Sequence, residues 1–233
     1  MTADDEIFSG TGEVNELHRF DAAALAAWLE REVPGLRGPL AVEQFKGGQS
    51  NPTFRLTDAA GRRYVMRAKP GPVAKLLPSA HAIEREYRVM SALGKAGLPV
   101  PRMLALCEDE SVIGRAFMVM ECVEGRIFWQ QELPGMQPAG RAAIYDEMNR
   151  VLATLHSVDC QAAGLADYGR PGNYFGRQIA RWSRQYRASE TEVMPAMDNL
   201  IAWLPENIPP GDETAVVHGD YRMDNMIFHP TEP

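Results

Sequence analysis

The sequence predicts an α+β protein of two lobes, with a β-rich first half followed by a helical second half. Up to residue 121, short runs of β-branched and apolar residues alternate with Gly-containing turns. Later in the chain, apolar residues recur every three or four positions over long stretches. We therefore expect a flexible arm at 1–20, a first lobe at 21–121, and a hinge with a partial helical second lobe at 122–233.

The first lobe is predicted to alternate strands with two helices. Asp21 is typical of an N-cap, and Leu25, Trp28 and Leu29 follow it at helical spacing. A second helix over 81–96 places its apolar residues on one buried face. The expected strands are Leu40 to Phe45, Thr53 to Leu56, Arg63 to Ala68, Met103 to Cys107 and Ala116 to Glu121.

The second lobe is predicted to be mainly helical. The expected helices are Arg141 to His156, Asn173 to Arg187, and a third that ends at Leu204. Pro195 is tolerated in the first turn of that third helix, because its missing N–H would have no partner there.

Composition narrows the class of protein. The 233 residues carry a formal net charge of −7, which argues against a general nucleic-acid binder. No apolar run approaches the ~20 residues of a membrane span. The three cysteines form no CxxC pair, so we expect no structural zinc site and a reducing cytoplasm.

A polar loop near the C-terminus carries the chemistry. Asp220 and Asn225 lie five residues apart between two apolar runs that look buried, 215–217 and 226–228. A carboxylate can orient a substrate hydroxyl and accept its proton, while an amide oxygen can ligate Mg²⁺. The alternative is a plain β-turn-β loop whose Asp and Asn cap their own backbone.

The residues 218–225, His-Gly-Asp-Tyr-Arg-Met-Asp-Asn, resemble the catalytic loop of the aminoglycoside phosphotransferase and choline kinase-like family. The segments 47–53, 76–81 and 84–89 narrow the resemblance to the kinase-like domains associated with acyl-CoA dehydrogenases. It runs from about Phe45 to the last residue. The resemblance implies a two-lobed protein-kinase-like fold, with an antiparallel sheet in the first lobe and mainly helices in the second.

The turn at Gly47, Gly48 and Ser50 is the expected phosphate loop for ATP or GTP. Glycines at the tip let backbone N–H groups approach phosphates, and the Ser50 hydroxyl adds a donor. An ordinary hairpin is the alternative, and no Walker A sequence follows.

The resemblance places Arg67 where kinases carry a lysine over the α/β-phosphates, with Glu86 as its orienting partner. Lys69 lies on the same side of the strand and is the substitute candidate. Glu84 lies on a different helix face, and we expect it to be solvated.

The remaining implied roles belong to the hinge and the loop. The backbone of Glu121 and Val123 would recognise adenine, Asp220 would be catalytic, and Asn225 would ligate Mg²⁺. In the family a further aspartate binds metal beyond the position of Pro233. We therefore expect a C-terminally truncated family member with impaired Mg²⁺ binding.

The function expected is a phosphotransferase acting on a hydroxyl of a small molecule. The narrower resemblance favours a hydroxyacyl-CoA over an aminoglycoside as the acceptor. A non-catalytic kinase-like module that binds nucleotide or acyl-CoA is the alternative, and aminoglycoside resistance is a third possibility. Neither nucleic acid nor membrane is expected as a partner.

Overall fold

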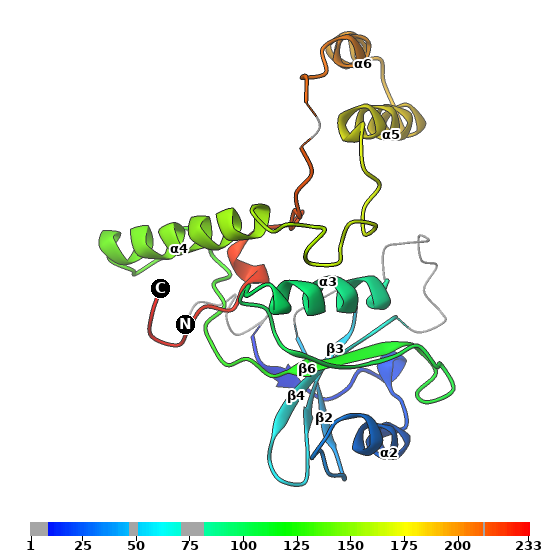
Figure 1. Ribbon diagram of the computed structural model, residues 1–233, viewed down its shortest axis with the longest axis vertical. Helices are drawn as coiled ribbons and strands as arrows, with labels where there is room; N and C mark the ends of the chain where they lie inside the picture. Colours follow the sequence, from blue (N-terminus) through cyan, green and yellow to red (C-terminus); the bar gives the residue numbers. More distant parts are fainter. Residues whose placement is uncertain (1–8, 47–50, 71–81, 212) are drawn as a thin grey trace. The chain divides into compact units, whose positions relative to one another are not determined.

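The computed structural model describes residues 9–46, 51–70, 82–211 and 213–233 (Figure 1). Its strands form one sheet in the order β1-β2-β3-β4-β6-β5, and each neighbouring pair is antiparallel. The strands are β1 (Thr11–Gly12), β2 (Ala41–Phe45), β3 (Thr53–Thr57), β4 (Arg63–Ala68), β5 (Met103–Cys107) and β6 (Phe117–Glu121). The predicted α+β class is confirmed, and so are the five predicted strands, whose ends shift by a residue at most.

The predicted helices are also present, and their described ends lie within a few residues of the expected ones. They are α2 (Ala22–Glu32), α3 (Ile83–Lys95), α4 (Pro138–His156), α5 (Tyr174–Ser189) and α6 (Pro195–Glu206). Two short 3-10 turns, η1 (Glu16–His18) and η2 (Met223–Asn225), complete the described elements. Over the described ranges, every helix is too short or too polar to cross a bilayer.

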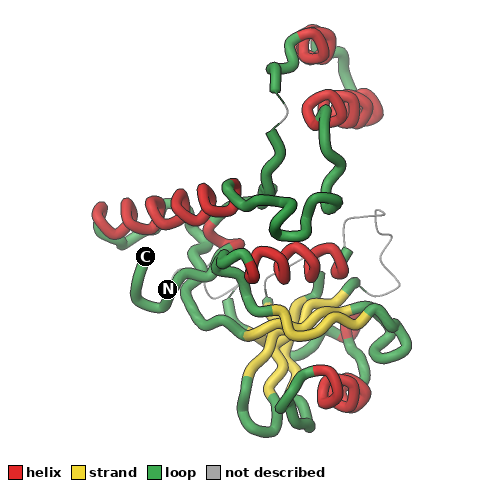
Figure 2. The backbone as a smooth tube through the Cα atoms, in the orientation of Figure 1, coloured by secondary structure: helices red, strands yellow, loops and turns green. Residues whose placement is uncertain are grey.

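Helices α2 and α3 cover opposite faces of the sheet (Figure 2). Strand alternation explains this, because successive side chains of a strand point to opposite faces. In β4, Tyr64 and Met66 join the core that contains Leu25 of α2, whereas Val65 packs in the cluster around Ile83 of α3. The sheet is thus buried on both sides, and the α3 side also receives Arg67.

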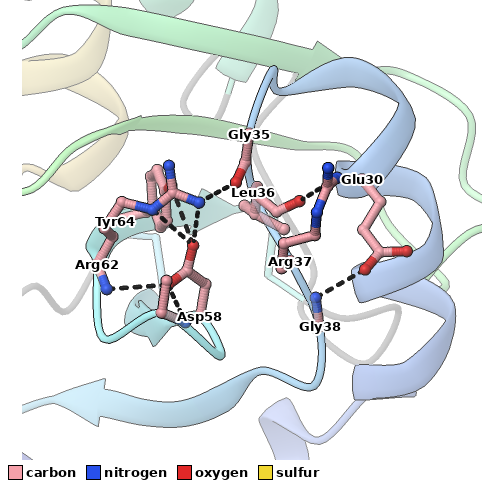
Figure 3. A network of polar contacts seen from close by, with 9 residues as sticks. Glu30, Gly35, Leu36, Arg37, Gly38, Asp58, Arg62 and Tyr64 are labelled. Carbon is pink, nitrogen blue, oxygen red and sulfur yellow. Dashed lines mark hydrogen bonds and ion pairs between the residues drawn. The ribbon is translucent and has the colours of Figure 1, made fainter.

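The turn between β3 and β4 is fixed by a buried carboxylate (Figure 3). Asp58 is only 4% exposed, and its Oδ1 accepts the backbone N–H groups of Ala60 and Arg62, each at 2.9 Å. The Nε of Arg62 donates to Oδ2 at 2.9 Å, and the same guanidinium reaches the carbonyl of Gly35. Burial alone would raise the pKa of Asp58, but these donors outweigh it and lower that pKa. The network therefore ties the start of β4 to the segment after α2.

Residues 11–20, expected as part of a flexible arm, instead contact the sheet at two places, although Leu17 within them is exposed. β1 pairs with β2, and Phe20 meets Phe54 edge-on with ring centroids 5.2 Å apart. The prediction fails here because the outer edge of β2 offers unpaired backbone groups, which a polar segment can satisfy as well as an apolar one.

The chain divides by its internal contacts into two compact units. One comprises Met1–Leu155 together with His218–Pro233, and the other comprises His156–Val217. This division differs from the lobe boundary expected between 121 and 122, because α4 and the polar loop at 218–225 group with the sheet. Within the second unit, α5 and α6 are linked by the Arg187–Asp198 ion pair.

Candidate active site

The contact expected between strand β4 and helix α3 is present. An Nη nitrogen of Arg67 lies 2.7 Å from an oxygen of Glu86, and both side chains are partly buried. The Nε of Arg67 is buried and has no hydrogen-bond partner among the described residues. Burial raises the pKa of Glu86, and Arg67 only partly offsets that effect. The pair is thus a cation with one donor that has no partner among the described residues, next to a carboxylate whose charged form it favours.

Glu84 is not simply solvated, contrary to our expectation. Its Oε2 lies 3.2 Å from Nζ of Lys69, so a second ion pair joins β4 to α3 beside the first. Helical spacing directs Glu84 to a different face of α3 from Glu86. The side chain of Lys69, just past the end of β4, is long enough to reach it there.

The predicted phosphate-loop residues Gly47, Gly48 and Ser50 lie outside the described residues. The strands that flank them are described, and β2 and β3 pair in antiparallel register with Gln44 opposite Phe54. The two strands expected on either side of this turn therefore pair as neighbours, while the role of the three residues stays a prediction.

The hinge residues lie at the end of β6. The backbone N–H of Glu121 donates to the carbonyl of Arg102 at 3.0 Å, and its carboxylate accepts the N–H of Arg102 at 2.9 Å. The N–H of Glu121 is therefore used within the sheet. Val123 is 39% exposed, and within the described chain no backbone group hydrogen-bonds to it. Of these two residues, only Val123 has a backbone N–H without a backbone partner within the described ranges.

The polar loop brings Asp220 and Asn225 together. The Nδ2 of Asn225 donates to Oδ2 of Asp220 at 2.7 Å and to its backbone carbonyl at 3.0 Å, and both residues are exposed. Because the amide nitrogen faces Asp220, the amide oxygen of Asn225 is left as an acceptor. The bond to the backbone carbonyl is also what a plain capping loop would show. The loop thus presents an exposed carboxylate beside an amide group whose nitrogen donates to it.

Several contacts hold this loop in place within the first unit, and they were not predicted from the sequence. The hydroxyl of Tyr221 donates to the carbonyl of Met148 in α4 at 2.7 Å. Met223 is fully buried in a cluster with Leu133, Ile144 and Phe228. An apolar residue within a polar run was the sequence signal for this anchor, since such a residue seeks a core.

Asp224 serves the loop itself. It accepts two bonds of 2.6 Å from the guanidinium of Arg222. The side chain of Gln131 contacts Asp224 Oδ1 and the backbone N–H of Met223, each at 3.4 Å. Asp224 is therefore occupied by contacts with Arg222 and Gln131.

The two apolar runs that flank the loop behave differently. Phe228 is buried and forms an antiparallel bridge with Arg126, with both backbone bonds at 2.8 Å. A side chain at Gly125 would overlap the carbonyl of Phe228, so this approach requires glycine. In contrast, the expected buried strand at 215–217 is wrong, since those residues form no strand and Val217 is 62% exposed. β-branched residues without a pairing partner do not make a strand.

The described residues offer few protein ligands for a metal. Within these ranges no group of three His, Cys, Asp or Glu side chains could hold an ion. Asn225 and Asp220 supply oxygen atoms at one place, and Mg²⁺ is often bound through one or two protein oxygens plus substrate phosphates. The residues present fit a metal held jointly with a nucleotide.

A sequence profile described as the phosphotransferase enzyme family matches residues 41–233. Two curated relatives are named as acyl-CoA dehydrogenase family members. Member 10 from Mus musculus is 51% identical over 207 residues, which cover 87% of this chain and 19% of that protein. Member 11 from Gallus gallus is 50% identical over 229 residues, which cover 96% and 29%. The chain thus spans less than a third of the length of either relative.

Solved structures show the same architecture. A Ralstonia eutropha protein, solved as a candidate aminoglycoside phosphotransferase, is 63% identical with a TM-score of 0.80 over 92% of this chain and 62% of that one. Macrolide 2′-phosphotransferase type I is 23% identical with a TM-score of 0.58, over 92% of this chain and 68% of that one. At that identity the second likeness shows the fold alone, which is the kinase-like fold of these phosphotransferases.

Proposed function

The chain belongs to the phosphotransferase enzyme family, and we propose that it transfers the terminal phosphoryl group of ATP or GTP to a hydroxyl of a small molecule. The observation that carries this proposal is the Asp220–Asn225 contact within an exposed loop. Phosphoryl transfer requires little covalent chemistry from the protein. In this loop, an Asp would accept a proton and an Asn would offer a metal ligand.

In the proposed reaction, Asp220 orients the acceptor hydroxyl and takes its proton as the new phosphate ester forms. Asn225 keeps the Asp220 carboxylate in place through Nδ2 and offers its amide oxygen to Mg²⁺. The bound metal would neutralise charge on the phosphates. Most of the rate would then come from positioning and charge neutralisation.

The nucleotide would lie against the sheet. Arg67, held by Glu86, would contact the α/β-phosphates, and its unpartnered Nε supports this role. Gly47, Gly48 and Ser50 would cover the phosphates. At the hinge, the N–H of Val123 would meet adenine, with Glu121 contributing through its carbonyl rather than its N–H, which is already used.

The acceptor that we propose is a hydroxyacyl-CoA. The support is the set of relatives that match almost the whole chain and are named acyl-CoA dehydrogenase family members, although the match covers less than a third of each. A domain in the same polypeptide as such an enzyme would meet acyl-CoA substrates. We place the protein in the cytoplasm, because its three cysteines are free thiols.

The test is phosphoryl transfer from labelled ATP to hydroxyacyl-CoA in the longest natural polypeptide that contains this chain. Asp220→Asn removes the proton acceptor, and we expect kcat to fall about 10²- to 10⁴-fold. Asp146→Asn, on an exposed position of α4, is the matched control and should keep the wild-type rate. An undiminished rate in Asp220→Asn would rule out the proposed mechanism.

A further inference from the structure

We propose that Lys69 is a positioning residue that, through Glu84, holds the first turn of α3 and thereby keeps Glu86 at Arg67. The inference rests on the proposed contact of Arg67 with nucleotide phosphates. It gives a task to the second ion pair between β4 and α3, in which the two charged atoms are 3.2 Å apart.

The geometry links the two ion pairs. Arg67 and Lys69 lie two residues apart, so their side chains leave the extended chain on the same side. Their partners Glu86 and Glu84 both lie in the first turn of α3. A slip of α3 by one residue along its axis moves both carboxylates by about 1.5 Å, which is enough to break either contact. The Lys69–Glu84 pair therefore opposes the same motion that would separate Arg67 from Glu86.

The start of α3 depends on Glu84. The N-cap residue Ala82 has no side chain that can bond the first N–H groups of the helix. The backbone N–H of Glu84 itself and the ammonium of Lys69 both lower the pKa of the Glu84 carboxyl group. A negative charge at this end also suits the helix dipole. The ion pair with Lys69 thus anchors a helix start that has no side-chain cap.

Apolar packing does not replace this anchor. Ile83 is fully buried against Met118 and Met120 of β6, which fixes how closely α3 approaches the sheet. Contacts among flexible apolar side chains set depth more than register, whereas a charged pair fixes which atoms meet. Glu86 needs that register, because its pKa is already raised by burial and only Arg67 favours its charged form.

The first experiment is a titration of the chain with Mg·ADP and, in parallel, with adenosine, which lacks phosphates. We expect Lys69→Met to weaken Mg·ADP binding about fivefold and to leave adenosine binding unchanged. Lys69→Arg should restore affinity, since it keeps a cation for Glu84. Glu84→Gln should match Lys69→Met, and the double variant should be no worse than either. Lys95→Met, at the exposed far end of α3, is the control and should bind as the wild type does.

Three outcomes would overturn the inference. If Glu84→Gln binds Mg·ADP normally while Lys69→Met does not, Lys69 touches the phosphates directly. Equal losses for adenosine would mean that the substitution damages the lobe in general. A full effect of Lys69→Met in an Arg67→Ala background would mean that Lys69 acts independently of Arg67.

A ligand-free measurement separates this inference from the proposed function. In a ¹³C NMR titration of the Glu86 carboxyl, Lys69→Met should raise the pKa of Glu86 further, because its contact with Arg67 loosens. An unchanged titration curve for Glu86 would rule out the positioning role of Lys69. A wild-type chain that binds no Mg·ADP would contradict the proposed function while leaving this readout decisive for Lys69.

Discussion

Two carboxylates in the first unit face arginines but are held in different ways. Asp58 is buried and receives two backbone N–H groups and the guanidinium of Arg62, with Tyr64 at 3.4 Å. Glu86 is partly buried and pairs with Arg67 at 2.7 Å. The pKa of Asp58 is lowered in spite of burial, whereas burial raises the pKa of Glu86 in spite of Arg67.

The difference separates a structural carboxylate from one that suits a binding site. Backbone donors fixed by a turn stabilise the charge of Asp58 whether or not anything binds nearby. The charged form of Glu86 is favoured by a single side-chain cation, so its environment responds to whatever else that cation contacts. A pair that is incompletely satisfied in the free protein is what a ligand-binding arginine needs.

The largest effect is expected at Asp58. Asp58→Asn keeps the size of the side chain but replaces one acceptor oxygen by a donor, which then faces N–H groups in a buried turn. We expect the free energy of unfolding to fall by about 2–4 kcal/mol, measured by urea denaturation. Asp109→Asn, in an exposed turn, is the control and should change stability far less. Equal effects at the two positions would remove the structural role of the Asp58 network.

An intermediate effect is expected at Glu86, and it should appear in nucleotide binding rather than in stability. Glu86→Gln removes a charge that burial disfavours, so the free energy of unfolding should change by less than about 1 kcal/mol. Binding of Mg·ADP should weaken about tenfold, because Arg67 loses its orienting partner. Calorimetric titration and urea denaturation of the same preparation test both parts. A loss of stability as large as that in Asp58→Asn would contradict the distinction between Asp58 as a structural carboxylate and Glu86 as one that suits a binding site.

The smallest effect is expected in the pH dependence of stability, where the two groups have opposite signs. The pKa of folded Asp58 lies below the ordinary 3.8, so its contribution is present above that value and lost as the pH falls through the folded pKa. The pKa of folded Glu86 lies above the ordinary 4.5, so ionisation of Glu86 costs stability as the pH rises from 4.5 through the folded pKa. Relative to Glu86→Gln, the wild type should therefore lose stability over that upper range. The comparison of unfolding free energies at several pH values tests the sign.

Much of the fold was predictable because its patterns are local. Alternation in 63–68 predicted a strand, apolar residues on one face of 81–96 predicted a helix, and both are present in the structure. The family resemblance and the association with acyl-CoA dehydrogenases are confirmed by the matched profile and relatives. The Arg67–Glu86 contact followed from that resemblance and is present. The roles assigned to these residues stay predictions.

What the sequence did not predict depends on partners that are distant along the chain. Lys69 forms an ion pair with Glu84, although helical spacing alone places Glu84 on a different face of α3 from Glu86. Gln131 contacts the polar loop across 93 positions, and no local pattern marks it. The run at 215–217 has strand propensity but no strand beside it, so it stays exposed. Strand propensity makes a segment able to form a strand, but the strand forms only where a neighbouring strand pairs with it.

The contact between Gly125 and the carbonyl of Phe228 constrains how this fold can be recombined. Two segments separated by about a hundred positions share one backbone interface, with no room for a β-carbon on one side. A chimaera that takes the segment around Phe228 from a relative can form this contact only while a glycine stays at position 125. When the crossover point lies between the two segments, the parent that supplies position 125 must carry that glycine.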